Sequence, residues 1–249
     1  MCQVFVPRLS VSSGPMEAPA VIRDSSGVLA ILTPAGIATQ SPPGVFSIET
    51  WLRERQHGGD PAGYVGVPHR LDRAVSGVLL MAATPRAARK LSRQFERREI
   101  VKTYLAVVHR AETAPVVGDE PVEWRDFLEK LPEEARSRLA DPGSLAAREA
   151  VTIARRLPAG PDAPADELLL LLGPRTGRMH QLRLQSASRG MPIVGDEIYG
   201  RAAGDVANDR TRPIMLHAWK IAYADPDSGE PLSIEAPLPR HWPAWALPG

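Results

Sequence analysis

The sequence has few of the features that would assign it to a protein class at once. Cys2 is the only cysteine in 249 residues, which excludes an intramolecular disulfide and a thiolate metal cluster. No apolar run is long enough to span a bilayer, and residues 1–15 lack the extended apolar core of a secretion signal. These absences favour a soluble, cytoplasmic protein with no metal and no membrane contact.

A general excess of basic charge is also missing. The formal net charge is +1, whereas proteins that hold nucleic acid mainly through its phosphates usually carry a clear positive excess. The charges are unevenly placed, however, because acids gather at residues 119–134. One segment is basic, with Arg86, Arg89, Lys90, Arg93, Arg97, Arg98 and Lys102. It predicts either a basic binding face or an ordinary solvated helix face.

Apolar patterning predicts a mixed, largely antiparallel α+β sheet, because strands dominate and many are joined by short turns. Strands are expected at residues 27–32, in the apolar run that ends at Ala82, and at 100–108, 148–157, 167–173, 216–223 and 232–236. Helices are expected from the N-cap Ser47 to Arg55, from Thr84-Pro85 onward, and from Met179 to a stop at Gly190. The length suits one domain, or one domain with a modest insertion.

A charged loop, His69-Arg70-Leu71-Asp72-Arg73, leads directly into the strand that ends at Ala82. Asp72 lies between two arginines, and opposite charges nearby favour the ionised form of a carboxylate. Taken alone, such a cluster favours a surface ion cluster that caps a strand over a catalytic group. The rest of the sequence has to decide between the two interpretations.

Four segments, in this order, resemble the RluA and RsuA branch of the RNA pseudouridine synthases. They are residues 69–77, 102–108, 175–200 and 215–219, with the words His-Arg-Leu-Asp-Arg, Lys-Thr-Tyr, His-Gln-Leu-Arg and Met-Leu-His. The resemblance implies the pseudouridine synthase fold, an α+β sheet split by a catalytic cleft. It implies a catalytic domain at residues 21–249 that contains a variable acidic insertion at 114–142, after an N-terminal extension at 1–20. Too few residues precede the first strand for an S4 RNA-binding module, and either Met1 or Met16 could be the start.

The implied reaction detaches uracil from ribose at N1 and reattaches it through C5, within ribosomal or transfer RNA. It is an isomerisation without net redox change, so no cofactor or metal is expected. The resemblance implies that Asp72 acts on the glycosidic bond, either as a nucleophile or as a general base. It implies that Arg183 is the partner of Asp72 and that the Tyr104 side chain stacks on the target uracil. Arg70 is expected to fill the gap left by the extruded uridine, and Leu216 to form an apolar floor.

His69, Arg178 and His180 complete the set that we expect beside the substrate. His69, His180 and His217 lack metal-ligand spacing, so we expect them to be framework residues that support the site through hydrogen bonds. The Gly195-Asp196 pair and Tyr199 are expected to shape a loop.

Three positions depart from the family pattern and leave the RNA target open. Thr33 stands where lysine is common, Val75 where threonine is common, and Gln185 where histidine is common. Two other functions stay possible at this point. One is an RNA-binding ribosome-assembly factor without catalysis, which the low net charge favours but an intact Asp72, Tyr104 and Arg183 do not. The other is a hydrolase that releases uracil from free nucleosides. No coiled coil or assembly element is evident, so a monomer is expected.

Overall fold

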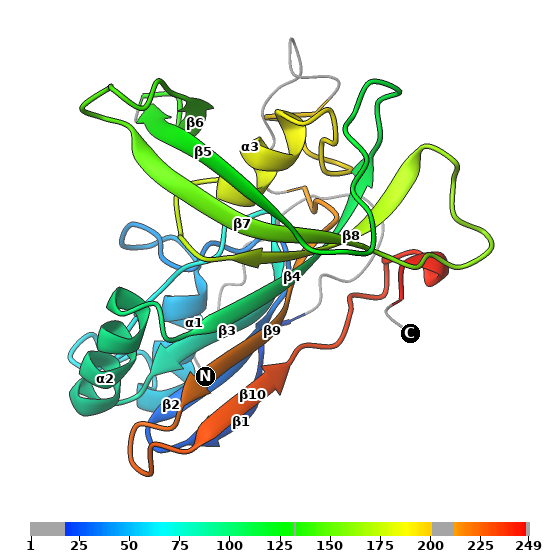
Figure 1. Ribbon diagram of the computed structural model, residues 1–249. Helices are drawn as coiled ribbons and strands as arrows, with labels where there is room; N and C mark the ends of the chain where they lie inside the picture. The colour runs from blue at the N-terminus through cyan, green and yellow to red at the C-terminus, as the bar shows by residue number, and fades with distance from the viewer. Residues whose placement is uncertain (1–17, 132, 201–211, 248–249) are drawn as a thin grey trace.

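The computed structural model describes residues 18–131, 133–200 and 212–247. Cys2, both candidate start residues and most of the predicted extension at 1–20 lie outside these ranges. The described strands form one sheet in the order β1-β2-β3-β9-β4-β8-β7-β5-β6, with β10 paired to β9 (Figure 1). Among these described strands, β3 and β9 are the only two that pair in parallel. The predicted mixed, mainly antiparallel α+β fold is confirmed.

The strands are β1 Ala20–Ser25, β2 Val28–Thr33, β3 Ser76–Ala82, β4 Val101–His109, β5 Val122–Leu131, β6 Arg136–Leu139, β7 Arg148–Leu157, β8 Glu167–Pro174, β9 Leu216–Ala224 and β10 Pro231–Glu235. The helices are α1 Ile48–His57, α2 Pro85–Glu96 and α3 Gln181–Ala187, followed by a short 3-10 turn, η1 Ala244–Ala246. Every element expected from the sequence is present, with ends shifted by a few residues at most. Strands β1, β5 and β6 were not expected.

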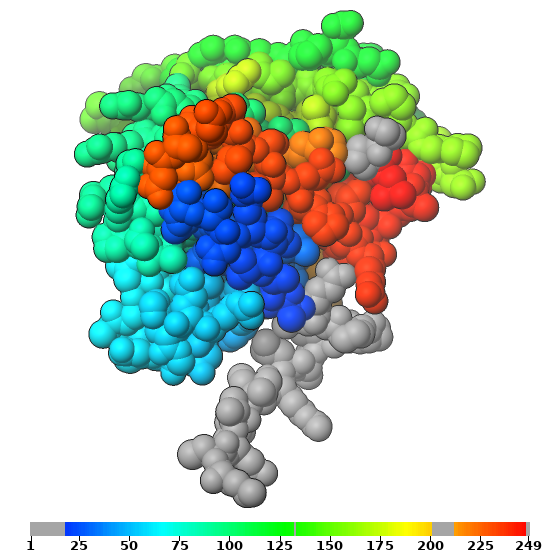
Figure 2. All heavy atoms as spheres, turned by 90° about the horizontal axis from the view of Figure 1, so that it is seen from below, coloured from blue at the N-terminus to red at the C-terminus, as the bar shows by residue number. Residues whose placement is uncertain are grey.

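Alternation along β2 and β3 places α1 and α2 on opposite faces of the first half of the sheet. Leu79 and Met81 pack with α1, whereas Val78 and Leu80 pack with α2. All of β3 is buried, which explains its unbroken apolar sequence. Seen from below (Figure 2), β1 in blue lies on the same face of the molecule as the orange closing hairpin and the cyan segment that contains α1.

Local capping explains where α1 and α2 begin. The Ser47 side chain accepts a hydrogen bond from the Thr50 amide, and the Thr50 side chain accepts one from the Ser47 amide, which makes a capping box. Thr84 accepts a hydrogen bond from the Ala87 amide, and Pro85 occupies the first helical position. Both caps agree with the sequence-based expectation.

The two halves of the sheet meet where the first residues of β3 lie beside the first residues of β9. Gly77 pairs there with Ala218 at φ 125°, and a Cβ added at Gly77 would lie 2.3 Å from the Ala218 carbonyl oxygen. Only glycine fits so close an approach at that φ. The junction brings the loop before β3, which carries Asp72, toward α3. Within the described ranges, no helix is long and apolar enough to cross a membrane.

Candidate active site

Asp72 is held by a loop that is fixed at two points. The Leu71 amide donates to Oγ1 of Thr39 over 3.1 Å. The Gly36 amide donates to the Arg73 carbonyl over 2.7 Å, and Nε of Arg73 donates back to the Gly36 carbonyl over 2.9 Å. The turn that ends at Gly36 therefore anchors the charged loop. The Asp72 side chain stays 27% exposed, so one carboxylate faces the solvent from a rigid backbone.

Arg183, on α3, is the cation that faces Asp72. Its side chain is only 5% exposed, and Nη1 lies 3.8 Å from Oδ2 of Asp72. Nε and Nη2 each donate to one oxygen of Asp196 over 2.7 Å, which is a bidentate pair. Burial disfavours the charged guanidinium, but the hydrogen bonds and charge of Asp196, aided by Asp72, raise the Arg183 pKa. The arginine is therefore fixed in place as a permanent cation.

Asp196 is the functional neighbour whose role the sequence did not reveal. Its side chain is 0% exposed, and Oδ1 also accepts the backbone amides of Ile198 and Tyr199. The Gly195-Asp196 pair thus shapes a loop, as expected, and the same carboxylate holds Arg183. Nothing in the spacing of two residues thirteen positions apart indicates this contact.

His180 also reaches Asp72, with Nε2 at 3.9 Å from Oδ2. The predicted start of the helix at Met179 is wrong, because α3 begins at Gln181 and His180 is its N-cap with φ 52°. This left-handed backbone is uncommon for a residue other than glycine, and such strain is often found at functional sites. Nδ1 of His180 lies 3.1 Å from the Tyr199 hydroxyl, and the Tyr199 ring lies 5.4 Å from the Arg183 guanidinium carbon.

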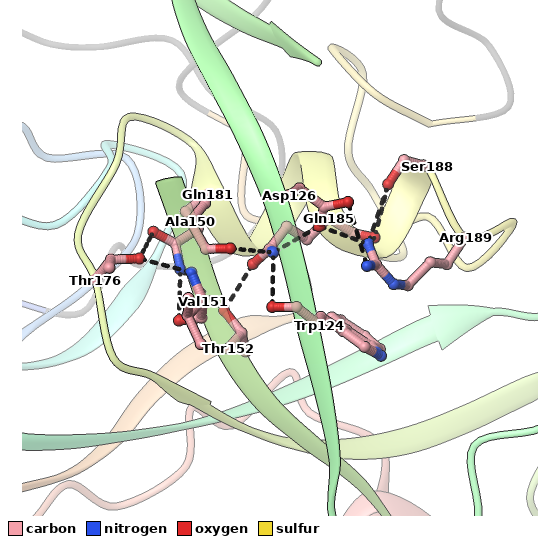
Figure 3. A network of polar contacts seen from close by, with 10 residues as sticks. All are labelled: Trp124, Asp126, Ala150, Val151, Thr152, Thr176, Gln181, Gln185, Ser188 and Arg189. Carbon is pink, nitrogen blue, oxygen red and sulfur yellow. Dashed lines mark hydrogen bonds and ion pairs between the residues drawn. The ribbon is translucent and has the colours of Figure 1, made fainter. Parts of the chain in front are cut away.

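A buried polar network on the sheet side of α3 fixes the helix that carries Arg183 (Figure 3). Oγ1 of Thr176 donates to Gln181 Oε1, and Nε2 of Gln181 donates to Oγ1 of Thr152. Oγ1 of Thr152 donates in turn to Oε1 of Gln185 over 2.7 Å. Nε2 of Gln185 donates to Asp126 over 2.7 Å. Gln185 therefore joins α3 to β7 and β5 as part of this network.

Tyr104, on β4, lies close enough to Asp72 for the charge of that carboxylate to act on its phenol. Its ring packs between two apolar clusters. Burial and the charge of Asp72 raise the pKa of the Tyr104 phenol, so the hydroxyl is protonated near neutral pH. Leu216 is 3% exposed and packs in the same cluster as Ala74 and Ile214.

A small cavity opens beside Asp72. Its walls come from the charged loop, α3 and the segments near residues 195 and 212, namely Asp72, Arg73, Ala74, His180, Arg183, Gly195, Glu197, Ile198, Arg212 and Ile214. Leu216 was expected as its floor, but the apolar side chains that line it are those of Ala74, Ile198 and Ile214. The structure therefore brings together Asp72, Arg183 and His180 at one opening.

Other expected site residues lie elsewhere. His69 accepts the Leu80 amide at Nε2 over 2.9 Å, and its ring centroid is 4.5 Å from that of Phe95. Burial, with a contribution from Lys102, lowers the His69 pKa to about 3, so the ring is a neutral support for β3. Nε of Arg178 donates to the Glu149 carbonyl over 2.9 Å. Neither residue lines the cavity. Arg70 does not line it either, but its side chain is exposed on the same loop as Asp72, two positions earlier.

The basic block on α2 divides into two parts. Arg86 pairs with Asp227, and Lys90 donates to the Pro226 carbonyl, so these two cations bind the turn between β9 and β10. Arg89 and Arg93 are exposed on the helix surface. Within the described ranges, no group of three or more histidine, cysteine or acidic side chains could hold a metal ion.

Comparison with known proteins places these residues in a family context. Residues 28–188 match the sequence model described as RNA pseudouridylate synthase. The tRNA pseudouridine synthase C of Salmonella typhi is 34% identical over 222 residues, which cover 83% of each chain. The ribosomal large subunit pseudouridine synthase C of Rickettsia felis is 33% identical, over 88% of this chain and 67% of its own. The solved structure of human RNA pseudouridylate synthase domain containing 1 superposes with a TM-score of 0.70 at 25% identity, over 92% of this chain and 87% of that chain.

Proposed function

From the premise that this chain belongs to the RNA pseudouridylate synthase family and isomerises uridine in RNA to pseudouridine, we propose that Asp72 acts on the glycosidic bond. The RNA is transfer or ribosomal RNA, because relatives at about one-third identity carry both kinds of name. One observation above all supports this role for Asp72. It is a partly exposed carboxylate at a cavity, and a buried arginine faces it at 3.8 Å without a short hydrogen bond.

That distance suits the chemistry. Arg183 places a positive charge beside Asp72, and it leaves the carboxylate oxygens available because 3.8 Å is too long for a hydrogen bond. In the reaction the bond from C1′ to N1 breaks, C1′ bonds to C5, C5 loses its proton and N1 gains one. Asp72 either attacks the sugar covalently or removes a proton and stabilises a cation-like sugar.

The other residues serve extrusion and placement of the base. Tyr104 offers a neutral ring for stacking, since its raised pKa keeps the phenol protonated. Arg70 is exposed on the Asp72 loop, where a long cation can enter the stack that the uridine leaves. No redox change occurs, so the reaction requires no cofactor. We further propose that the protein works as a cytoplasmic monomer.

The experiment is a pseudouridine map of total RNA from cells that carry the protein, the Asp72→Ala form or the control Asp227→Ala form at equal abundance. Asp227 is an exposed carboxylate paired with Arg86, away from the cavity. We expect one or a few uridines to lose modification with Asp72→Ala alone, which also names the target. An unchanged map would contradict catalysis by Asp72 and favour an RNA-binding factor. Release of uracil from free uridine by the purified protein would instead favour a nucleoside hydrolase.

A further inference from the structure

Lys102 is a half-buried cation on β4, two residues before Tyr104. Within the described part of the chain, no carboxylate pairs with its ammonium group and no hydrogen bond to it is present. Burial lowers the Lys102 pKa, with no opposing charge to raise it. Charged groups that are removed from water are usually paired, because an unpaired one is costly to bury. The described part of the chain therefore holds a cation without supplying an anion for it.

Two other segments approach this ammonium group. A Cβ added at Gly177, in the segment before α3, would lie 3.7 Å from Nζ of Lys102. On another side, the Lys102 charge reaches the His69 ring closely enough to help lower its pKa. The charged loop, β4 and the segment that leads to His180 and Arg183 thus converge on Lys102. Along a strand, Lys102 and Tyr104 are about 7 Å apart, so a base stacked on Tyr104 would have the cation beside it and not under it.

We propose that Lys102 binds a backbone phosphate of the RNA next to the uridine that enters the site. This inference rests on the proposed function, because it takes RNA as the substrate. RNA carries one negative charge at every nucleotide, and lysine binds phosphate as a compact point charge with three donors. The extruded uridine stays covalently joined to its flanking phosphates, so one of them must lie near the rim of the site. A phosphate there supplies the anion that Lys102 lacks.

Lys102→Met and Lys102→Arg are compared with the control Lys90→Met. Lys90 lies on α2, and its ammonium group donates to the Pro226 carbonyl in the turn between β9 and β10. The probes are bulk tRNA and bulk ribosomal RNA from cells that lack the protein, and the dissociation constant is measured at several salt concentrations. Methionine keeps the length of lysine without its charge, so it loses the phosphate contact and its counterion release. We expect Lys102→Met to weaken binding about tenfold and to reduce the slope of log affinity against log salt by about 0.7 to 0.9. Lys102→Arg keeps the slope, and Lys90→Met changes neither quantity.

A wild-type slope and affinity for Lys102→Met would overturn the inference, and so would weaker binding at an unchanged slope, which indicates a contact other than phosphate. A merely structural role would lower the melting temperature of Lys102→Met, whereas removal of an unpaired buried charge leaves it unchanged or higher. Pseudouridine is measured in the same wild-type samples. If the wild-type protein forms pseudouridine but Lys102→Met binds RNA with wild-type affinity and slope, this inference alone is refuted. If Lys102→Met shows the weaker binding and the smaller slope but the wild-type protein forms no pseudouridine, the proposed function is refuted and the phosphate contact stands. If the wild-type protein shows no salt-dependent binding to either RNA, both are overturned.

Discussion

The bidentate pair between Arg183 and Asp196 gives the sharpest prediction, because both side chains are buried and only one of them faces the cavity. The change Asp196→Asn keeps the shape of the side chain but replaces one acceptor oxygen by an NH2 group that faces the guanidinium donors. One charge-assisted hydrogen bond and the counter-charge are lost together. The amides of Ile198 and Tyr199 can still donate to the remaining oxygen.

The expected cost follows from the burial of Arg183. Removing one partner of a buried ion pair costs about 3 to 5 kcal/mol, because the other charge is left uncompensated. For a domain of this size each kcal/mol lowers the melting temperature by about 2 to 4 °C, which gives a fall of about 6 to 20 °C. A second effect concerns activity. Without Asp196, Arg183 is free to close the 3.8 Å gap to Asp72 and form a direct pair, which occupies the carboxylate that must react.

The assay is thermal unfolding together with the single-turnover rate of pseudouridine formation, for Asp196→Asn and the control Asp227→Asn. The control pair is exposed, so its loss should cost less than about 1 kcal/mol and leave the rate unchanged. The double variant Asp196→Asn with Arg183→Met should be more stable than the sum of the two single losses, because the stranded charge is gone. A melting temperature and rate equal to wild type for Asp196→Asn would refute the reasoning.

Three further predictions concern the framework around the site. Burial lowers the His217 pKa from 6.5 to about 4, so between these values the unfolded chain binds a proton that the folded chain excludes. Stability is fully present above pH 6.5 and falls by about 3 kcal/mol toward pH 4, and urea titrations of His217→Gln should show a flatter profile. Gly77→Ala, which meets the Ala218 carbonyl, should cost about 3 kcal/mol or more in urea unfolding, against about 1 for Gly229→Ala at an open turn. Gln185→Leu leaves several buried groups of the polar network unpaired and should cost about 2 to 4 kcal/mol in the same assay, so a neutral result would contradict the role given to that network.

Much of the fold could be predicted from the sequence, because most of its elements have clear local signals. The strand ending at Ala82 is one unbroken apolar run, and Ser47 and Thr84 begin their helices with recognisable caps. Strand β5 has a weaker signal. Trp124 and Leu128 are buried on one face, but Asp126 lies between them on that face and binds Gln185. A polar residue at a core position breaks the alternation that identifies a strand.

The parts of the candidate site that could be predicted are the residues that lie in recognisable sequence motifs. The position of Asp72 and its approach to Arg183 follow from the motifs, but the catalytic role of Asp72 stays a prediction. Contacts between distant segments could not be predicted. Asp196 reaches Arg183 only because α3 and the following loop fold back together, and His69 turns toward Phe95 because β3 and α2 pack around it. Spacing in the sequence does not record such tertiary neighbours.

The most direct test of the central claim uses purified protein and cellular RNA whose uridines carry deuterium at C5. Formation of the C1′ to C5 bond must release that label to water, so its appearance reports the reaction itself. The account predicts label release and pseudouridine for the wild-type protein, and neither for Asp72→Asn, although the variant folds and binds the RNA as wild type does. Label release by Asp72→Asn at the wild-type rate would contradict the claim that Asp72 acts on the glycosidic bond.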